Sequence, residues 1–164
     1  MNLKRALVIL LFIQLISFAG WAQKNLSVTQ RKSVTFDLSA LIASGTNNEM
    51  VTDNSQWINY TMQVHHGDPL SSISVGIASG TIPSGIELYM QADYDNGSGW
   101  GRVGTPAGKV KVDYAPKVLI NGIGNSSTGN GKHKGHKLIF SLVITDFALL
   151  QSGDYTLYIQ YTLN

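Results

Sequence analysis

Hydrophobic and polar residues alternate most regularly at the end of the chain. One set of alternate positions holds Tyr155, Leu157, Ile159, Tyr161 and Leu163, and the other set holds threonine, tyrosine and glutamine. Successive side chains of a β-strand point to opposite faces of its sheet, so this pattern predicts a strand with one face in a core. A second β-rich segment, residues 138–144, precedes it across a connection at residues 146–154.

Shorter segments of the same character occur throughout the rest of the chain. Strands are predicted at residues 26–29, 33–38, 57–65, 72–77, 86–92, 109–113 and 117–120, and polar loops at residues 44–54, 93–108 and 121–135. After residue 22 no window of eleven or more residues keeps apolar positions at a helical spacing, and residues 147–150 match one helical turn at most. Seven to nine strands separated by turn residues predict an all-β protein. Strands this short and unequal, with long connections, favour an antiparallel β-sandwich over a barrel.

The first 22 residues have the three parts of a secretory signal peptide. Lys4 and Arg5 precede an apolar segment at residues 6–16, and the small residues Gly20 and Ala22 stand before a predicted cleavage site. The alternative is a transmembrane anchor, but the apolar run of about 13 residues is shorter than the ~20 that a spanning helix needs. We therefore expect a signal-peptide helix at residues 1–22, one sandwich domain at residues 23–164, and no transmembrane span after cleavage.

Cleavage changes the charge of the chain. The sequence has 12 basic and 10 acidic residues, and Lys4 and Arg5 leave with the signal peptide, so the remaining domain is close to neutral. A nucleic-acid partner would need a clustered basic face, and none is visible. The chain has no cysteine, which excludes a bacterial lipoprotein anchor and disulfide bonds, so that packing and hydrogen bonds must stabilise the domain.

The connection before the last strand resembles the E–F corner of immunoglobulin-type sandwiches. The residues that carry the resemblance are Leu142-x-Ile144-x-x-Phe147 followed by Gln151-x-Gly153-x-Tyr155-x-Leu157. The resemblance implies an immunoglobulin-like sandwich in which Tyr155, two residues after Gly153, is buried and bonds back to the backbone as a tyrosine corner. Gln151 departs from the usual Asp of such corners, and Leu157 departs from the usual Cys.

The end of the chain is also similar to pilin-type surface subunits. Gly153-x-Tyr155 leads into a strand that closes with Tyr161-Thr162-Leu163-Asn164, after a loop at residues 120–124 and a Gly135-His136-Lys137-Leu138 segment. This pattern resembles spore-coat-U-like secreted fimbrial subunits and small exported sandwiches of Bacteroidetes type. The resemblance implies an exported or cell-surface, non-enzymatic protein with a structural or adhesive role.

Histidines and aspartates are the candidates for metal binding. His65 and His66 follow a predicted strand, while lysines that would repel a cation flank His133 and His136. We interpret all four as solvated loop histidines and expect no metal or cofactor. Asp93 and Asp95 open a Gly-rich loop and are weak candidates for Ca²⁺, but the loop lacks the distant Glu of an EF-hand, and Asp also forms turns for local reasons.

Three aromatic residues are candidates for ligand binding. Tyr94, Trp100 and Tyr114 lie in or near the predicted loop at residues 93–108, where a cluster of exposed rings would stack on a sugar. The alternative is that Trp100 folds back as a lid on the end of the sandwich. The sequence has neither a phosphate-binding loop nor a G-x-S-x-G elbow, so we expect no enzymatic activity.

Two functions follow from these patterns. The first is a structural or adhesive sandwich, a subunit of a surface assembly; the alternative is a carbohydrate- or Ca²⁺-binding module that uses the loops at residues 93–108 and 121–135. Because the last predicted strand ends the sequence, its open edge must be covered. Either residues 24–38 pair beside it within the same chain, or a strand from a neighbouring molecule adds there by self-association.

The signal-peptide hypothesis predicts that the exported protein begins at Gln23. N-terminal sequencing of the exported protein should return Gln23, and the protein should stay in solution without residues 1–22. Recovery of Met1 at the N-terminus, or retention on membranes after a salt wash, would contradict the hypothesis.

Overall fold

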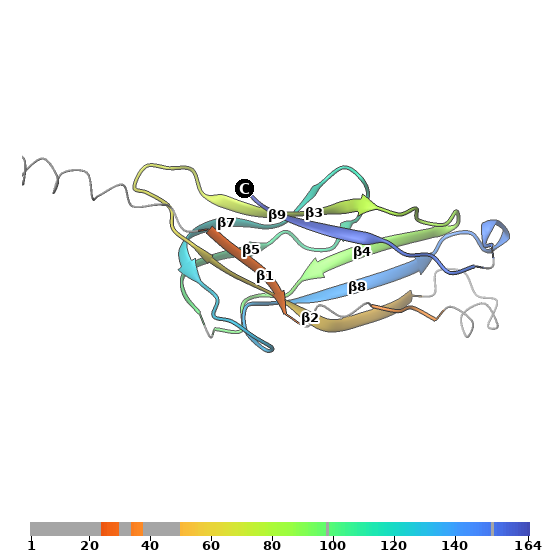
Figure 1. Ribbon diagram of the computed structural model, residues 1–164, viewed down its shortest axis with the longest axis horizontal. Helices are drawn as coiled ribbons and strands as arrows, with labels where there is room; N and C mark the ends of the chain where they lie inside the picture. Colours follow the sequence, from red (N-terminus) through yellow and green to blue (C-terminus); the bar gives the residue numbers. More distant parts are fainter. Residues whose placement is uncertain (1–23, 30–33, 38–49, 98, 152) are drawn as a thin grey trace, which may run out of the picture.

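Nine β-strands and one 3₁₀ turn make up the regular structure in the computed structural model, which describes residues 24–29, 34–37, 50–97, 99–151 and 153–164 (Figure 1). The strands are β1 (Lys24–Thr29), β2 (Met50–Met62), β3 (Ser71–Ser79), β4 (Ile86–Ala92), β5 (Trp100–Pro106), β6 (Val110–Lys111), β7 (Lys117–Ser127), β8 (His136–Ile144) and β9 (Tyr158–Leu163), and η1 is Phe147–Leu149. The predicted signal peptide lies outside the described residues. Across the ranges described, no helix is long and apolar enough to cross a bilayer.

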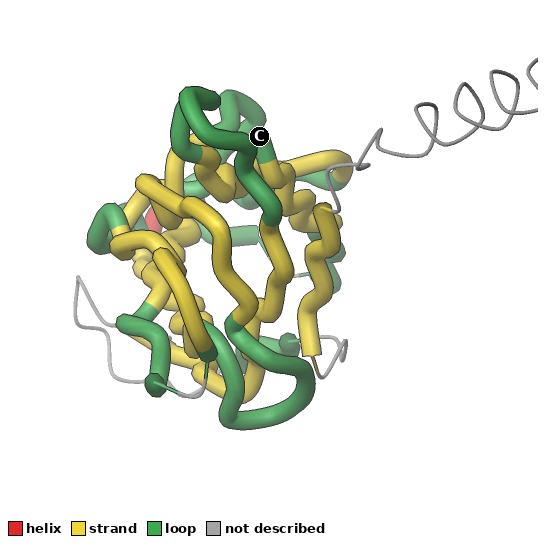
Figure 2. The backbone as a smooth tube through the Cα atoms, turned by 90° about the vertical axis from the view of Figure 1, so that its left-hand side faces the viewer, coloured by secondary structure: helices red, strands yellow, loops and turns green. Residues whose placement is uncertain are grey.

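All the strand pairs are antiparallel, and they form two groups. One group runs β1-β2-β8-β4-β6, and the other runs β5-β7-β3-β9. The groups join where Thr61 and Met62 of β2 pair with Ser127 and Ser126 of β7. The resulting sheet folds around a common interior, as the view along the long axis shows (Figure 2). The predicted all-β class is confirmed, with a strand number in the expected range.

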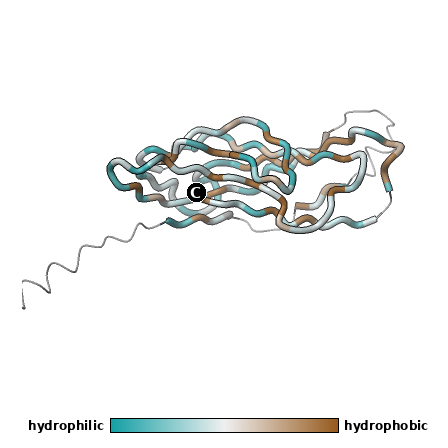
Figure 3. Tube along the Cα trace, turned by 90° about the horizontal axis from the view of Figure 1, so that it is seen from above, coloured by the Kyte–Doolittle hydropathy of each residue, from teal (hydrophilic) through white to brown (hydrophobic). Residues whose placement is uncertain are grey.

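One hydrophobic core lies between the two groups of strands. Its buried residues come from both groups and include Ile58, Tyr60, Met62, Ile73, Val75, Leu88, Met90, Leu119, Ile120, Ile123, Leu138 and Phe140. A contact across the interior confirms that the groups face each other, since the Tyr161 hydroxyl of β9 donates to the Met90 sulfur of β4 at 3.6 Å. Hydrophobic and hydrophilic residues alternate along several strands, as expected when one face of each strand meets a core (Figure 3).

The strand order contains part of the immunoglobulin arrangement. The run β1-β2-β8-β4 has the order of strands A, B, E and D, and the β3–β9 pair corresponds to strands C and F. The chain departs from that arrangement between β4 and β8, where it inserts β5, β6 and β7. Among the described strands, β9 pairs with β3 alone and therefore lies at an edge of the described sheet.

Glycine explains why sequence patterns missed β5 and the last seven residues of β7. The loops predicted at residues 93–108 and 121–135 contain β5 and the last residues of β7, so this part of the prediction is wrong. Gly101 has φ +79°, and a Cβ there would lie 2.0 Å from the Asn125 carbonyl oxygen. Only glycine lets β5 approach β7 this closely, although glycine in a sequence usually indicates a loop. By contrast, the prediction at residues 86–92 coincides with β4.

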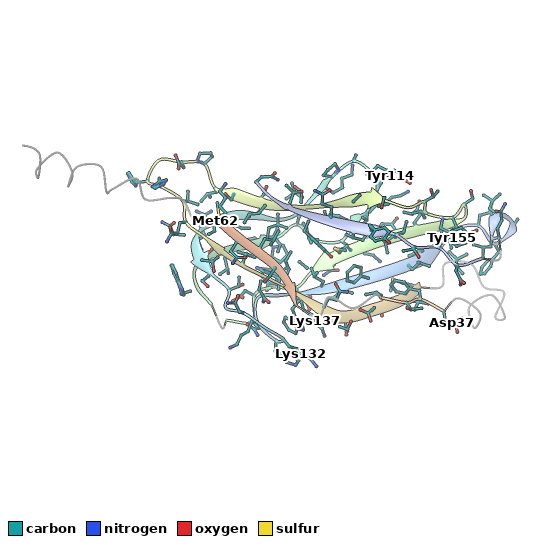
Figure 4. The ribbon with its side chains drawn as sticks, viewed as in Figure 1. Asp37, Met62, Tyr114, Lys132, Lys137 and Tyr155 are labelled. Atoms are coloured by element: carbon teal, nitrogen blue, oxygen red, sulfur yellow. The ribbon has the colours of Figure 1, made fainter. Side chains whose placement is uncertain are left out.

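The predicted tyrosine corner is not formed as expected. β9 begins at Tyr158, and Tyr155 lies before it with 47% of its surface exposed and its ring against Gly153 (Figure 4). The expectation of a buried Tyr155 is therefore wrong. Tyr161 takes the inward position instead, beside Leu157, Ile159 and Leu163, and burial raises the pKa of Tyr161 far above its ordinary value. The alternation continues as predicted from Leu157 onward.

The N-terminal segment does not cover β9 where it is described. β1 pairs along its whole length with β2, from Lys24 opposite Met62 to Thr29 opposite Trp57. Residues 34–37 form no strand, although Val34 and Phe36 pack against the core. The expectation that residues 24–38 pair beside the last strand is thus wrong for β1, because the outer edge of β2 is the closer partner for it.

The two tyrosines flanking the start of β9 should differ in their contribution to stability. Tyr161→Ala removes a ring that packs on the core, and we expect the free energy of unfolding to fall by about 2–4 kcal/mol. Tyr155→Ala removes a half-exposed ring and should lower it by less than about 1 kcal/mol. Urea denaturation followed by tryptophan fluorescence measures both, and a larger loss for Tyr155→Ala would contradict the arrangement.

Candidate functional site

The three predicted aromatic residues are exposed but do not form one platform. The exposed fractions are 74% for Tyr94, 62% for Trp100 and 61% for Tyr114. Trp100 starts β5 opposite Ser127, near the end of β7, whereas the Tyr114 hydroxyl donates to the Gly80 carbonyl beyond the far end of β3. Figure 4 places Tyr114 far along the molecule from Met62, the last residue of β2. Tyr114 is therefore separated from Trp100, and no common sugar-binding platform includes both.

Trp100 borders a hollow at the end of the molecule where β2 stops. The hollow has a volume of about 360 Å³, and Gln63, Val64, His65, Trp100 and Asn125 line it. The backbone N–H of Val64 donates to the side-chain oxygen of Asn125, which connects the segment after β2 to β7. Sequence patterns missed this site because its residues come from three separate segments that only strand pairing brings together.

The two predicted binding loops contact each other, but the recorded hydrogen bonds of Asp93 and Asp95 are to groups of the protein itself. The Asn96 side chain donates to the His133 carbonyl, and one carboxylate oxygen of Asp95 accepts from the Gly97 N–H at 2.8 Å. Asp93 contributes its backbone carbonyl to a hydrogen bond with His136. Within the described ranges, no three His, Cys, Asp or Glu side chains lie close enough to hold a metal ion together. Asp95 thus makes a turn contact, whereas Asp93 bonds β8 through its backbone N–H and carbonyl.

His136 is buried, which overturns its interpretation as a solvated loop residue. Its ring is fully enclosed and stacks on Tyr60, with the ring centroids 5.8 Å apart. Its Nδ1 atom lies 2.7 Å from the Asp93 carbonyl oxygen, and its Nε2 atom lies 2.8 Å from the Tyr60 hydroxyl and 3.2 Å from the Val103 carbonyl oxygen. The sequence contained a signal for this burial, because His136, Leu138 and Phe140 are alternate residues and so lie on the same face of a strand.

These contacts determine where protons sit in the network. A carbonyl oxygen can only accept, so Nδ1 of His136 carries a hydrogen and donates to Asp93. The Tyr60 hydroxyl donates to the Val103 carbonyl and also contacts Nε2 of His136. Burial raises the pKa of Tyr60 far above its ordinary value, and the charge of Asp95 adds to that rise. Tyr60 therefore stays protonated, and the network connects β2, β5, β8 and the end of β4.

A second set of buried polar groups holds the loop at residues 128–135 against β2. The Asn59 side chain donates to the Lys134 carbonyl at 2.6 Å and accepts from the Gly131 N–H at 3.2 Å. Thr128 accepts from the Tyr60 N–H through its hydroxyl at 2.9 Å. Gly135 has φ +69°, and a Cβ there would lie 2.3 Å from the Ile58 carbonyl oxygen. The loop is thus part of the framework around the middle of β2.

The outer edge of β9 is a second candidate site. The Asn164 N–H donates to the Ser72 carbonyl at 2.9 Å, so the backbone groups of Asn164 face β3. Alternation along an antiparallel strand then directs the N–H and C=O groups of Ile159, Tyr161 and Leu163 away from β3. Of the strands described, only β3 pairs with β9. This edge offers backbone donors and acceptors for one further strand.

Comparisons with protein-family models, with curated proteins and with solved structures return no match for this chain. The resemblance to fimbrial subunits and to exported sandwiches therefore stays a prediction from the residues that carry it.

The buried network predicts unequal effects for two tyrosine-to-phenylalanine changes. Tyr60→Phe leaves the Val103 carbonyl without its hydroxyl donor, and we expect the free energy of unfolding to fall by about 1–2 kcal/mol. The matched control is Tyr89→Phe, because the Tyr89 hydroxyl donates to the Glu87 carboxylate at the surface, where the loss should stay below about 0.5 kcal/mol. Equal losses in urea denaturation would contradict a structural role for the network.

Proposed function

We propose that this chain is an exported, non-enzymatic structural or adhesive protein that associates with further copies of itself through the outer edge of β9. One observation carries the proposal: β9 keeps its core-facing side chains packed while one side of its backbone has no strand partner among the described residues. A row of free backbone groups beside an apolar face is the feature that strand addition uses.

The other edge strands differ from β9 in ways that discourage pairing. β5 contains Arg102 and Pro106 and has a register irregularity between Gly101 and Val103, and β6 has only two residues, one of them Lys111. The remaining edge strand, β1, begins with the charged Lys24. Charged residues, proline, bulges and shortness are the usual protections of an edge. β9, Tyr158-Ile159-Gln160-Tyr161-Thr162-Leu163, has no charge, no proline and no glycine. This contrast supports β9 as the edge that accepts a partner.

A second copy of β9 is the simplest partner for this edge. Two copies of one strand can pair antiparallel around a two-fold axis, so that each supplies the same backbone groups to the other. Exposed Tyr158, Gln160 and Thr162 would then lie beside their counterparts on the outer face. Cross-strand pairs of aromatic and threonine side chains add to the stability of such a sheet.

Export is supported by the sequence pattern of residues 1–22, and the structural or adhesive role by the resemblance of the chain end to fimbrial subunits. His136 and Tyr60 are buried and bond to groups of the protein itself. A catalytic site would expose such polar residues to a substrate, so their burial supports a structural role.

Lysines on β9 test the proposal. Gln160→Lys combined with Thr162→Lys places two positive charges on exposed positions of the edge, where they face the same charges of a second copy. Sedimentation equilibrium should show association of the wild-type protein and at least about tenfold weaker association of the double variant, because like charges across an interface are unfavourable.

Thr105→Lys on β5 is the matched control, because Thr105 is also exposed on an edge strand of the same group. It should associate as strongly as the wild type. A wild-type protein that remains monomeric at every accessible concentration, or equal weakening by all the lysines, would refute association through β9. Thermal melting confirms that each variant is folded.

A further inference from the structure

We infer that the hollow beside Trp100 binds a neutral saccharide. The inference deepens the adhesive part of the proposed function and rests on it, but it concerns a surface away from the outer edge of β9. Gln63, Val64, His65, Trp100 and Asn125 line the hollow, which is shallow, open to solvent and about 360 Å³ in volume.

Trp100 supplies the apolar surface that such a ligand needs. It is the first residue of β5, and pairing with Ser127 of β7 holds its backbone in place. Its side chain is 62% exposed, which is unusual for the largest apolar residue at the end of a paired strand. A sugar ring has faces of C–H groups that pack against an aromatic face, so an exposed indole on a paired strand offers it a stacking surface.

The other side chains supply hydrogen bonds without charge. Gln63 and His65 are exposed beside Trp100, and Asn125 uses its side-chain oxygen to accept from the Val64 N–H. The Asn125 NH₂ group is then the part of that amide that can donate to a ligand. Among the residues that the structure describes, no Lys, Arg, Asp or Glu lines the hollow, which favours a polyhydroxylated neutral ligand over an anion or a metal ion.

The other two aromatic residues predicted for ligand binding fit this role less well. Tyr114 commits its hydroxyl to the Gly80 carbonyl, at the far end of β3 from Trp100. Tyr94 follows β4 and is not among the residues that line the hollow beside Trp100. Trp100 is therefore not part of a platform with Tyr114. Its neighbours in the hollow are Gln63 and His65, which no sequence pattern linked to it.

Affinity electrophoresis in native gels tests the inference on protein purified after expression of the full-length chain. The gels contain dextran, laminarin, xylan or galactomannan as neutral probes, and heparin as an anionic probe. At least one neutral polysaccharide should retard the wild type. Trp100→Ala should weaken that binding at least about tenfold, because it removes the stacking surface. Gln63→Ala and His65→Ala should each weaken it about two- to tenfold, the effect of one hydrogen bond.

Tyr114→Ala is the matched control, since it removes an equally exposed aromatic ring outside the hollow, and it should bind as the wild type does. Each variant is also made with Gln160→Lys and Thr162→Lys, so that multivalent binding by associated copies does not mask a weak site. Retardation of this variant by a neutral probe supports the inference whether or not β9 associates.

The inference is overturned if none of the neutral polysaccharides retards the wild type, or if Trp100→Ala binds unchanged. It is also overturned if Trp100→Ala and Tyr114→Ala lose binding equally, or if heparin alone retards the protein. Loss of binding with normal sedimentation behaviour leaves the proposed association intact, so the two failures are distinguishable.

Discussion

Backbone pairing by a single long strand, β2, is the constraint on which the rest of the structure depends. The first part of its 13 residues pairs with β8, its second part pairs with β1 on the other side, and its last residues pair with β7. A buried strand must satisfy its N–H and C=O groups, and β2 does so by joining the two groups of strands. The core residues Ile58, Tyr60 and Met62 lie on this same segment.

A chain without cysteine uses buried hydrogen bonds to connect its loops to this strand. Tyr60 and Asn59 are neighbours on β2 whose side chains reach the Val103 carbonyl of β5 and the loop carbonyl of Lys134. His136 completes the connection by bonding the Asp93 carbonyl after β4. Unsatisfied groups at such depth would cost more than the bonds contribute, which makes the network specific for one arrangement of the loops.

The two surfaces that remain open have different chemistry. The outer edge of β9 presents backbone groups beside an uncharged strand, which suits another strand. The hollow beside Trp100 presents an aromatic ring with amide and imidazole groups, which suits a small polar ligand. Because the two surfaces use different residues, the proposed association and the proposed ligand binding do not exclude each other.

The sequence by itself determined the all-β class, the position of β4, and the face of β9 that meets the core, because alternation of side chains is a local property of a strand. Tertiary structure decided which residues on the core-facing side of the pattern are in fact buried. Tyr155 and Tyr161 share one parity, but only Tyr161 lies within the strand that pairs with β3 and reaches Met90.

Tertiary contacts also explain the other differences between the sequence-based predictions and the structure. In the sequence, Gly101 and His136 both have the character of loop residues. In the structure, Gly101 lies in a strand against β7, and His136 is enclosed by Tyr60 and the Asp93 carbonyl. The hollow beside Trp100 combines residues from three segments, so no pattern along the chain could predict it. Burial of a particular side chain depends on which strands become neighbours, and that choice is made by packing over the whole chain.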